Sequence, residues 1–266
     1  MKHIDITLED VQSVYDGPEG ILWELIMGEQ IHVGGFKSSM ILAQKAGLKE
    51  GMKGLDLCSA LGAGCRFLVQ NFNVAMCGLD ATDTMIEKAE ERAKLAGLEG
   101  KIEFKKGDVS NIPYVDETFD FVWGEDAWCY VVDKTKLIAE ASRVLKSGST
   151  LAFTDWIEGP AGLGDEEAER INRFMKFPYM ESLDGYKKLI EANGLKIIET
   201  EDLTEEFAGY IDFYIKMLTD QLTFDALKII GNNLDMFKAM GGEMMYMAQK
   251  AHEGKFGRGR FIAKKE

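Results

Sequence analysis

Cysteine and proline are scarce in this 266-residue chain, which contains four of each. The cysteines (Cys58, Cys65, Cys77 and Cys129) form no C-x-x-C pair and no Cys/His cluster with zinc spacing. The sequence therefore indicates neither a zinc site nor a thioredoxin-type site, and we expect reduced, buried thiols. With 46% hydrophobic and 29% charged residues, the composition is typical of a globular protein and excludes disordered, collagen-like and low-complexity chains.

Basic residues are also fewer than acidic ones. The chain has 31 Lys and Arg and 45 Asp and Glu, which gives a formal net charge of −14. A field of this sign argues against nucleic acid or an anionic membrane surface as partner and favours a small molecule. The first ten residues lack the basic start and apolar core of a signal peptide. The low-charge stretch 57–79 contains Arg66 and three glycines, so it is a poor membrane span. We expect a cytoplasmic protein, monomeric or homodimeric.

Short apolar runs alternate with helical periods between residues 40 and 155, a pattern typical of β-α-β units. Right-handed crossovers place such strands in a parallel sheet with helices on both faces. The sequence therefore predicts an α/β fold with a doubly wound, Rossmann-like sheet. The predicted strands are 54–58, 73–80, 102–105, 119–123 and 150–155, and the predicted helices are 65–71, 83–96 and 134–145.

The pattern becomes helix-rich after residue 156. A helix over 183–193 and strands over 195–201 and 256–264 interrupt it. Residues 204–253 are predicted to be helical, with an apolar stripe that includes Phe207, Ile211 and Tyr214. Helices between two late strands have the position of a lid.

Acidic residues accompany the first three predicted strands, whose carboxyl ends are where ligands bind in open parallel sheets. Asp80 ends the second strand, where it can accept hydrogen bonds from both hydroxyls of a ribose. Asp108 and Val109 follow the third, where a carboxylate can accept from an exocyclic adenine amine. Asp56 lies in the first strand and suits a ligand with an ammonium group.

The sequence of the loop after the first strand distinguishes a dinucleotide site from a site for another nucleoside ligand. Gly62-Ala-Gly-Cys-Arg-Phe67 lacks the third glycine of G-x-G-x-x-G, and Asp56 stands where a dinucleotide site needs room for a pyrophosphate. These features together describe a site for S-adenosylmethionine.

At this point the chain resembles the class I S-adenosylmethionine-dependent methyltransferases, within the small-molecule branch that contains the glycine, sarcosine and dimethylglycine N-methyltransferases. The resemblance covers residues 11–155 clearly. It implies a seven-stranded, mostly parallel sheet whose last strand is antiparallel, with a helical lid. It also implies S-adenosylmethionine as donor, S-adenosylhomocysteine as product, no metal and a small-molecule acceptor. The matching segments are Val14–Asp16, Glu29–Gly34, Leu55–Val69, Gly78–Asp80, Gly107–Asp108, Tyr130–Lys134 and Arg143–Gly148.

On this basis we expect a single methyltransferase domain over residues 1–266. Its parts are an N-terminal helical cap (1–39), a cofactor-binding core (40–155), a helical lid (156–182 and 204–254) and two segments that complete the sheet (183–203 and 255–266).

Two loop positions depart from the family. Its first two loop glycines are Cys58 and Ala60 here, and only Gly62 is unchanged. A β-carbon at positions 58 and 60 crowds the loop and can change its backbone path. We still expect the cofactor to contact residues at the first four strand ends: Asp56, Cys58, Ala60, Gly62, Arg66, Asp80, Ala81, Met85, Asp108, Val109, Gly124 and Glu125.

Methyl transfer from a sulfonium requires alignment and no nucleophilic side chain, and a base is needed only if the acceptor must lose a proton. The catalytic candidates are His32, Tyr15 and Tyr130, although His32 could instead brace a turn by hydrogen bonding and Tyr15 could be a core tyrosine. Glu125 and Asp126 could attract a cationic acceptor, and Trp128 or Tyr130 could face a methylated ammonium. The expected acceptor contacts are Tyr15, Trp128, Tyr130, Trp156, Arg173 and Tyr214.

We therefore predict methyl transfer to an amine nitrogen of a sarcosine- or dimethylglycine-like metabolite. An acceptor carboxylate would have six candidate partners: Arg66, Arg143, Arg173, Lys176, Arg258 and Arg260. Two alternatives stay open. One is a C-, O- or S-methyltransferase of a small apolar acceptor, suggested by methionines in the late helices such as Met240 and Met244. The other is a non-catalytic sensor that only binds the cofactor.

Overall fold

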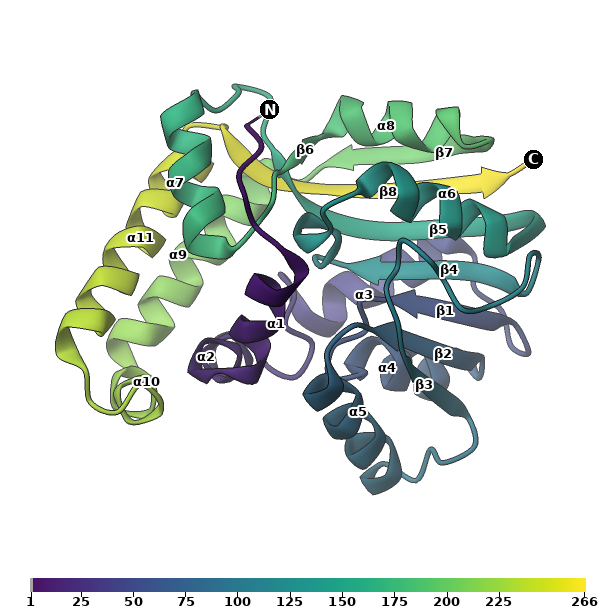
Figure 1. Cartoon of the computed structure of the whole chain (residues 1–266), viewed down its shortest axis with the longest axis horizontal. Coiled ribbons are helices and arrows are strands. Elements are labelled where there is room, and N and C mark those ends of the chain that lie inside the picture. The colour runs from purple at the N-terminus through teal and green to yellow at the C-terminus, as the bar shows by residue number, and fades with distance from the viewer. Residues whose placement is uncertain (1) are drawn as a thin grey trace.

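The sheet runs through the middle of the molecule, with helices packed on both of its faces (Figure 1). The computed structural model describes residues 2–266. Its strands are β1 (Lys53–Leu57), β2 (Ala75–Asp80), β3 (Ile102–Lys106), β4 (Phe119–Glu125), β5 (Leu145–Glu158), β6 (Glu181–Ser182), β7 (Leu195–Asp202) and β8 (Phe256–Lys265).

The strand order is β3-β2-β1-β4-β5-β8-β7, with β6 paired to β5 beside this path. The last strand, β8, runs antiparallel to β5 and β7, while β1 to β5 pair in parallel. The predicted doubly wound sheet with an antiparallel last strand is confirmed. The eighth strand is the two-residue β6, which is too short to leave an alternating pattern in the sequence.

Alternate residues along the strands supply two separate cores, one on each face of the sheet. Val122 of β4 belongs to the core under α6 and α8, while its neighbours Phe121 and Trp123 belong to the core under α3 and α4. This alternation follows from the two-residue repeat of a strand. The helices on the two faces and beside β3 are α3 (Gly35–Ala46), α4 (Ala63–Phe72), α5 (Asp83–Leu95), α6 (Lys134–Val144) and α8 (Leu183–Ala192).

The remaining helices gather beyond one end of the sheet, on the left in Figure 1. The predicted stripe of α9 is buried there, because Phe207, Ile211 and Tyr214 pack against α7 and α11. These helices are α1 (Leu8–Asp16), α2 (Pro18–Met27), α7 (Asp165–Met175), α9 (Thr204–Asp220), α10 (Thr223–Ile229) and α11 (Leu234–His252).

Several predicted bounds need correction. The helical stretch 204–253 is broken into α9, α10 and α11, and β5 begins at Leu145, five residues before its predicted start. Asp133 caps α6 by accepting a hydrogen bond from the Lys136 amide at 2.9 Å, which fixes the start of that helix.

All four cysteines are unpaired, and three of them are buried while Cys58 is partly exposed. Across residues 2–266, no helix is both long and apolar enough to cross a membrane.

Candidate active site

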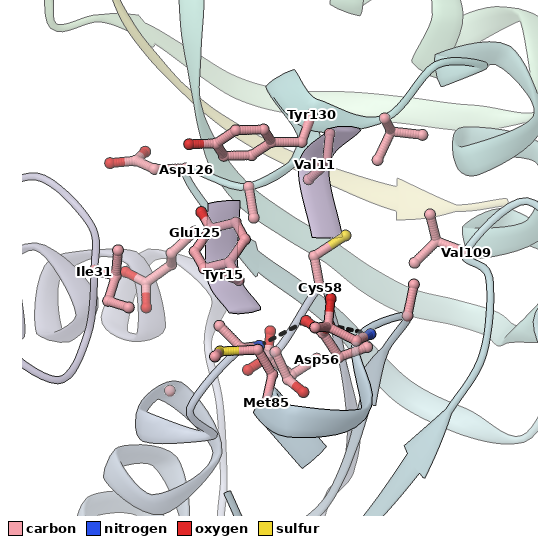
Figure 2. Close-up of a pocket in the computed structure, with 18 of the residues that line it drawn as sticks. Val11, Tyr15, Ile31, Asp56, Cys58, Met85, Val109, Glu125, Asp126 and Tyr130 are labelled. Carbon is pink, nitrogen blue, oxygen red and sulfur yellow. Dashed lines mark hydrogen bonds between the residues drawn. The ribbon is translucent and has the colours of Figure 1, made fainter. Parts of the chain in front are cut away.

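A pocket opens where β1, β2, β3 and β4 end, and residues of α1 and of the segment before α3 close it from the other side. Its volume is about 1210 Å³, including its open mouth. Figure 2 shows Ile31 and Glu125 on one side, Val109 on the opposite side, and Tyr15, Tyr130 and Cys58 between them.

Twelve of the predicted site residues line this pocket. Most come from strand ends, and two come from the N-terminal segment. They are Tyr15, His32, Asp56, Cys58, Ala60, Asp80, Ala81, Met85, Asp108, Val109, Glu125 and Tyr130.

Asp80 is held by the backbone at the end of β2. Its Oδ2 accepts a hydrogen bond from the Ala60 amide and its Oδ1 accepts one from the Thr82 amide, both at 2.9 Å. Burial raises the pKa of Asp80, and these amide bonds oppose the rise. A carboxylate offers about four lone pairs, so two remain for a ligand such as a ribose diol.

Glu125 is fixed by one of its two oxygens. Its Oε2 accepts from the Ser39 hydroxyl at 3.0 Å and from the Trp123 indole at 3.2 Å, and it lies 3.5 Å from His32 Nε2. Burial raises the pKa of Glu125. Burial also raises the pKa of Asp56 well above its usual value, and the charge of Glu125 adds to that rise.

Three buried polar atoms of the pocket lining have no hydrogen-bond partner: Gln30 Nε2, Ser59 Oγ and Glu125 Oε1. Leaving such an atom unsatisfied costs roughly 1–3 kcal/mol, so each of the three could gain from a polar ligand that reaches it. Sequence reasoning missed Gln30 and Ser59 as site residues, although both lie inside segments that carry the family resemblance.

Tyr15 and Tyr130 meet edge to face, with ring centroids 5.8 Å apart. Burial is the largest cause that raises the pKa of both phenols far above neutrality. Both therefore stay protonated, and they can donate a hydrogen bond or form a wall but do not act as bases.

Both ring nitrogens of His32 already have protein partners. Nδ1 lies 3.2 Å from the Val33 carbonyl oxygen and Nε2 lies 3.1 Å from Ser39 Oγ. Only 2% of the residue is exposed. These contacts are those of a residue that braces the wall of the pocket. Asp126 is also engaged, since it accepts from the Val33 amide and from Arg258.

The loop after β1 has unusual backbone angles at Cys58 and Ala60, the two positions where the resembled family has glycine. Cys58 has φ 61° and Ala60 has φ 43°, so both adopt a left-handed conformation that favours glycine, at roughly 1–2 kcal/mol each. The bond from the Ala60 amide to Asp80 holds this conformation. The β-carbons thus introduce strain while the backbone keeps a glycine-like path.

Three predicted cofactor residues lie outside the lining. Gly62 is the N-cap residue before α4, with φ 67°, and packs against Phe104, and Gly124 packs against the Trp128 ring. Arg66 is buried and pairs with Glu29, which is itself a lining residue.

Four predicted acceptor residues also lie outside the lining. Trp128 is fully buried and stacks on Phe153 at 4.1 Å, and Trp156 packs inside the lid. Arg173 is exposed and pairs with Glu169, and the Tyr214 hydroxyl accepts a long bond from the Gly34 amide.

Residues 55–153 match the family described as a methyltransferase domain. The chain is 28% identical over 195 residues to phosphoethanolamine N-methyltransferase 1 of Triticum aestivum, an alignment that covers 73% of this chain and 38% of the wheat protein. It is also 28% identical over 167 residues to the glycine/sarcosine/dimethylglycine N-methyltransferase of Actinopolyspora halophila, covering 62% and 29%. The chain therefore spans well under two thirds of the length of these curated relatives.

The fold is that of the class I methyltransferases. A Galdieria sulphuraria protein assigned as a sarcosine dimethylglycine methyltransferase superposes with a TM-score of 0.85 at 23% identity, over 95% of this chain and 98% of that one. The cyclase SpnF superposes with a TM-score of 0.82 at 18% identity, over 100% and 99%. Because one fold serves both reactions, the function must be argued from the pocket.

Within residues 2–266, no group of three or more His, Cys, Asp or Glu side chains is arranged to hold a metal ion.

Proposed function

We propose that the protein transfers a methyl group from S-adenosylmethionine to an amine nitrogen of a small molecule. The observation that carries the proposal is the alignment of Asp56, Asp80 and Asp108 along one pocket at the ends of three adjacent strands. The Haemonchus contortus phosphoethanolamine N-methyltransferase 2, which has this fold (TM-score 0.85, 20% identity, over 98% of this chain and 60% of that one), was solved with S-adenosylmethionine.

In this proposal each acid holds a different part of the donor. Asp108 and Val109 hold the adenine, Asp80 holds the ribose hydroxyls through its free lone pairs, and Asp56 holds the ammonium group. The unpartnered Gln30 amide supplies a hydrogen bond for the donor's carboxylate.

The donor supplies an electrophilic methyl group on a sulfonium sulfur. The chain's part is to hold the acceptor nitrogen in line with that carbon and to exclude water, which is worth several orders of magnitude in rate. Tyr15 and Tyr130 form the wall beside this position, and His32 braces it. An acidic chain with unpaired cysteines fits a reducing cytoplasm, and we place the enzyme there.

An apolar acceptor methylated at carbon, oxygen or sulfur is the second candidate. The observation that favours it is the apolar part of the lining contributed by Leu8, Val11, Ile31, Val131 and Val132.

Calorimetry tests the donor assignment. We expect S-adenosylhomocysteine to bind and NAD not to bind, and the reverse result rejects the assignment. An acceptor panel with counting of transferred methyl groups then separates nitrogen from the other acceptor atoms. Tight donor binding without turnover on a broad panel would favour a sensor.

A further inference from the structure

The charges that line the pocket are almost all of one sign. Among the described residues, the lining contains no lysine and no arginine, and His32 is its only basic residue. Seven lining residues are acidic: Glu29, Asp56, Asp80, Asp108, Glu125, Asp126 and Asp133. An anionic group on the acceptor would enter this pocket without a lysine or arginine among the lining residues, and the unpartnered Gln30 amide is already assigned to the donor's carboxylate.

Three arginines outside the lining pair with two of its acids: Arg258 with Asp126, and Arg66 and Arg92 with Glu29. The guanidinium of Arg258 is buried and donates to Asp126, Ser38 and Thr154 at 2.7–2.9 Å. Arg66 donates to Glu29 and to the carbonyl of Leu61.

The remaining candidate cations lie further away. Arg143 binds Asp116 and Glu140, Arg260 binds Glu201, and Arg173 binds Glu169 on the surface. The buried Lys134 donates to the backbone carbonyls of Cys129, Val131 and Tyr179. Lys176 ends α7 and is not among the lining residues.

One acid has an oxygen available to a ligand. The side chain of Glu125 is only 5% exposed, its Oε2 is fixed by Ser39 and Trp123, and its Oε1 is buried without a hydrogen-bond partner, on a residue that lines the pocket. Figure 2 places Glu125 near Ile31 and Tyr15, on the side away from Val109 and the adenine position. A buried carboxylate oxygen in this position matches an ammonium N–H.

We propose that the acceptor is an amine without a carboxylate or phosphate group, and that Glu125 selects it by binding its ammonium form and accepting its proton. This inference rests on the proposed methyl transfer. The inference excludes a sarcosine- or phosphoethanolamine-like acceptor. The reactive form of such a molecule has a deprotonated amine and therefore carries a net negative charge, and the pocket lining has no Lys or Arg to pair with it.

The proton and electron balance is simple. An ammonium nitrogen has no lone pair, so one N–H proton passes first to Glu125 Oε1. The freed lone pair forms the new N–C bond, the C–S bond breaks, and sulfur keeps its electron pair. Ser39 and His32 hold the opposite oxygen of Glu125 in place during the transfer.

The test uses matched pairs of probes titrated calorimetrically into the full chain saturated with S-adenosylhomocysteine. The first pair is N,N-dimethylethanolamine and dimethylglycine, and the second is N,N-dimethylbenzylamine and its 4-carboxylate. In each pair, we expect the amine without a carboxylate to bind at least tenfold more tightly than the amine with one. We also expect it to be methylated in preference. Equal or tighter binding of the anionic member overturns the proposal. So does binding of neither member, and the proposed function then still stands if S-adenosylhomocysteine binds.

Glu125→Gln sharpens the assignment, because it keeps the shape of the side chain and removes its charge. We expect at least a tenfold loss of amine binding and a distinctly smaller change in the affinity for S-adenosylhomocysteine. Glu87→Gln, the same change on an exposed residue of α5, is the control and should alter neither. If Glu125→Gln weakens S-adenosylhomocysteine as much as the amine, Glu125 belongs to the donor site and the proposal fails.

Discussion

The two halves of the pocket are built by different means. In the donor half, Asp80 is anchored by backbone amides within one loop and one strand end. In the acceptor half, Glu125 and the Tyr130 segment are anchored by side chains from distant parts of the chain, such as Ser39 and Asp155. Damage to the donor half should therefore cost affinity, whereas damage beneath the acceptor half should cost stability.

Trp128→Ala should have the largest effect. Trp128 is fully buried beneath the acceptor half and stacks on Phe153. Its removal should lower the free energy of unfolding by about 3–5 kcal/mol, measured by chemical denaturation. Phe224→Ala, a change at a residue that is 85% exposed, is the control and should stay within about 0.5 kcal/mol. A loss below about 1 kcal/mol for Trp128→Ala would place this ring outside the core.

Asp155→Asn should change the pH dependence of stability. Asp155 accepts from the Cys129 amide and the Tyr186 hydroxyl, and burial raises its pKa from 3.8 to about 6. The folded state holds this proton more tightly than the unfolded chain does. The stabilising contribution of protonated Asp155 to the free energy of unfolding is therefore present below about pH 4 and is lost as the pH rises through 6.

Wild type should therefore lose about 2 kcal/mol relative to Asp155→Asn between pH 4 and pH 6, out of a total of about 3 kcal/mol that is reached above pH 7. Denaturation curves across pH 4–7 measure this difference. Asp225→Asn, on the exposed side of α10, should leave the wild-type profile unchanged, and parallel profiles for wild type and Asp155→Asn would contradict the prediction.

Asp80→Ala tests the donor half. Loss of the carboxylate removes the paired hydrogen bonds to the ribose and should weaken S-adenosylhomocysteine binding by about 1.5–3 kcal/mol if those bonds are charge-assisted. Asp80→Asn keeps the shape and one acceptor oxygen, so its loss should be smaller. Unchanged affinity for both variants would show that the donor does not lie on β2.

Ala60→Gly should have the smallest effect, and it should stabilise the protein where the other substitutions weaken stability or binding. Relief of the left-handed strain gives roughly 1–2 kcal/mol, and the added freedom of glycine in the unfolded chain removes roughly 0.5–1 kcal/mol. A net stabilisation of about 0.5–1 kcal/mol should appear in thermal unfolding. Ala139→Gly in the middle of α6 should destabilise by a similar amount, and destabilisation by both changes would argue against strain at Ala60.

Much of the donor half could be predicted from the sequence, because each of its acids stands at a fixed offset from one apolar run. Asp56, Asp80 and Asp108 all line one pocket, as expected. Strand-end geometry is local, so a single sequence carries it.

The acceptor half could not be predicted in the same way. Trp128 has the residue type of an ammonium-binding aromatic, but it packs against the central strands β4 and β5, where Gly124 leaves space for its ring and Phe153 stacks on it. Likewise, the pairing of Asp126 with Arg258 joins residues 132 positions apart. No local pattern reveals such a contact, and it decides which charges remain available to a ligand.

The most direct test of the account is a crystal structure of the protein with S-adenosylhomocysteine. We predict that the ribose hydroxyls contact Asp80, that the adenine lies beside Asp108 and Val109, and that the sulfur faces the space between Tyr15, Tyr130 and Glu125. A ligand bound elsewhere, or a ribose that does not reach the end of β2, would contradict it.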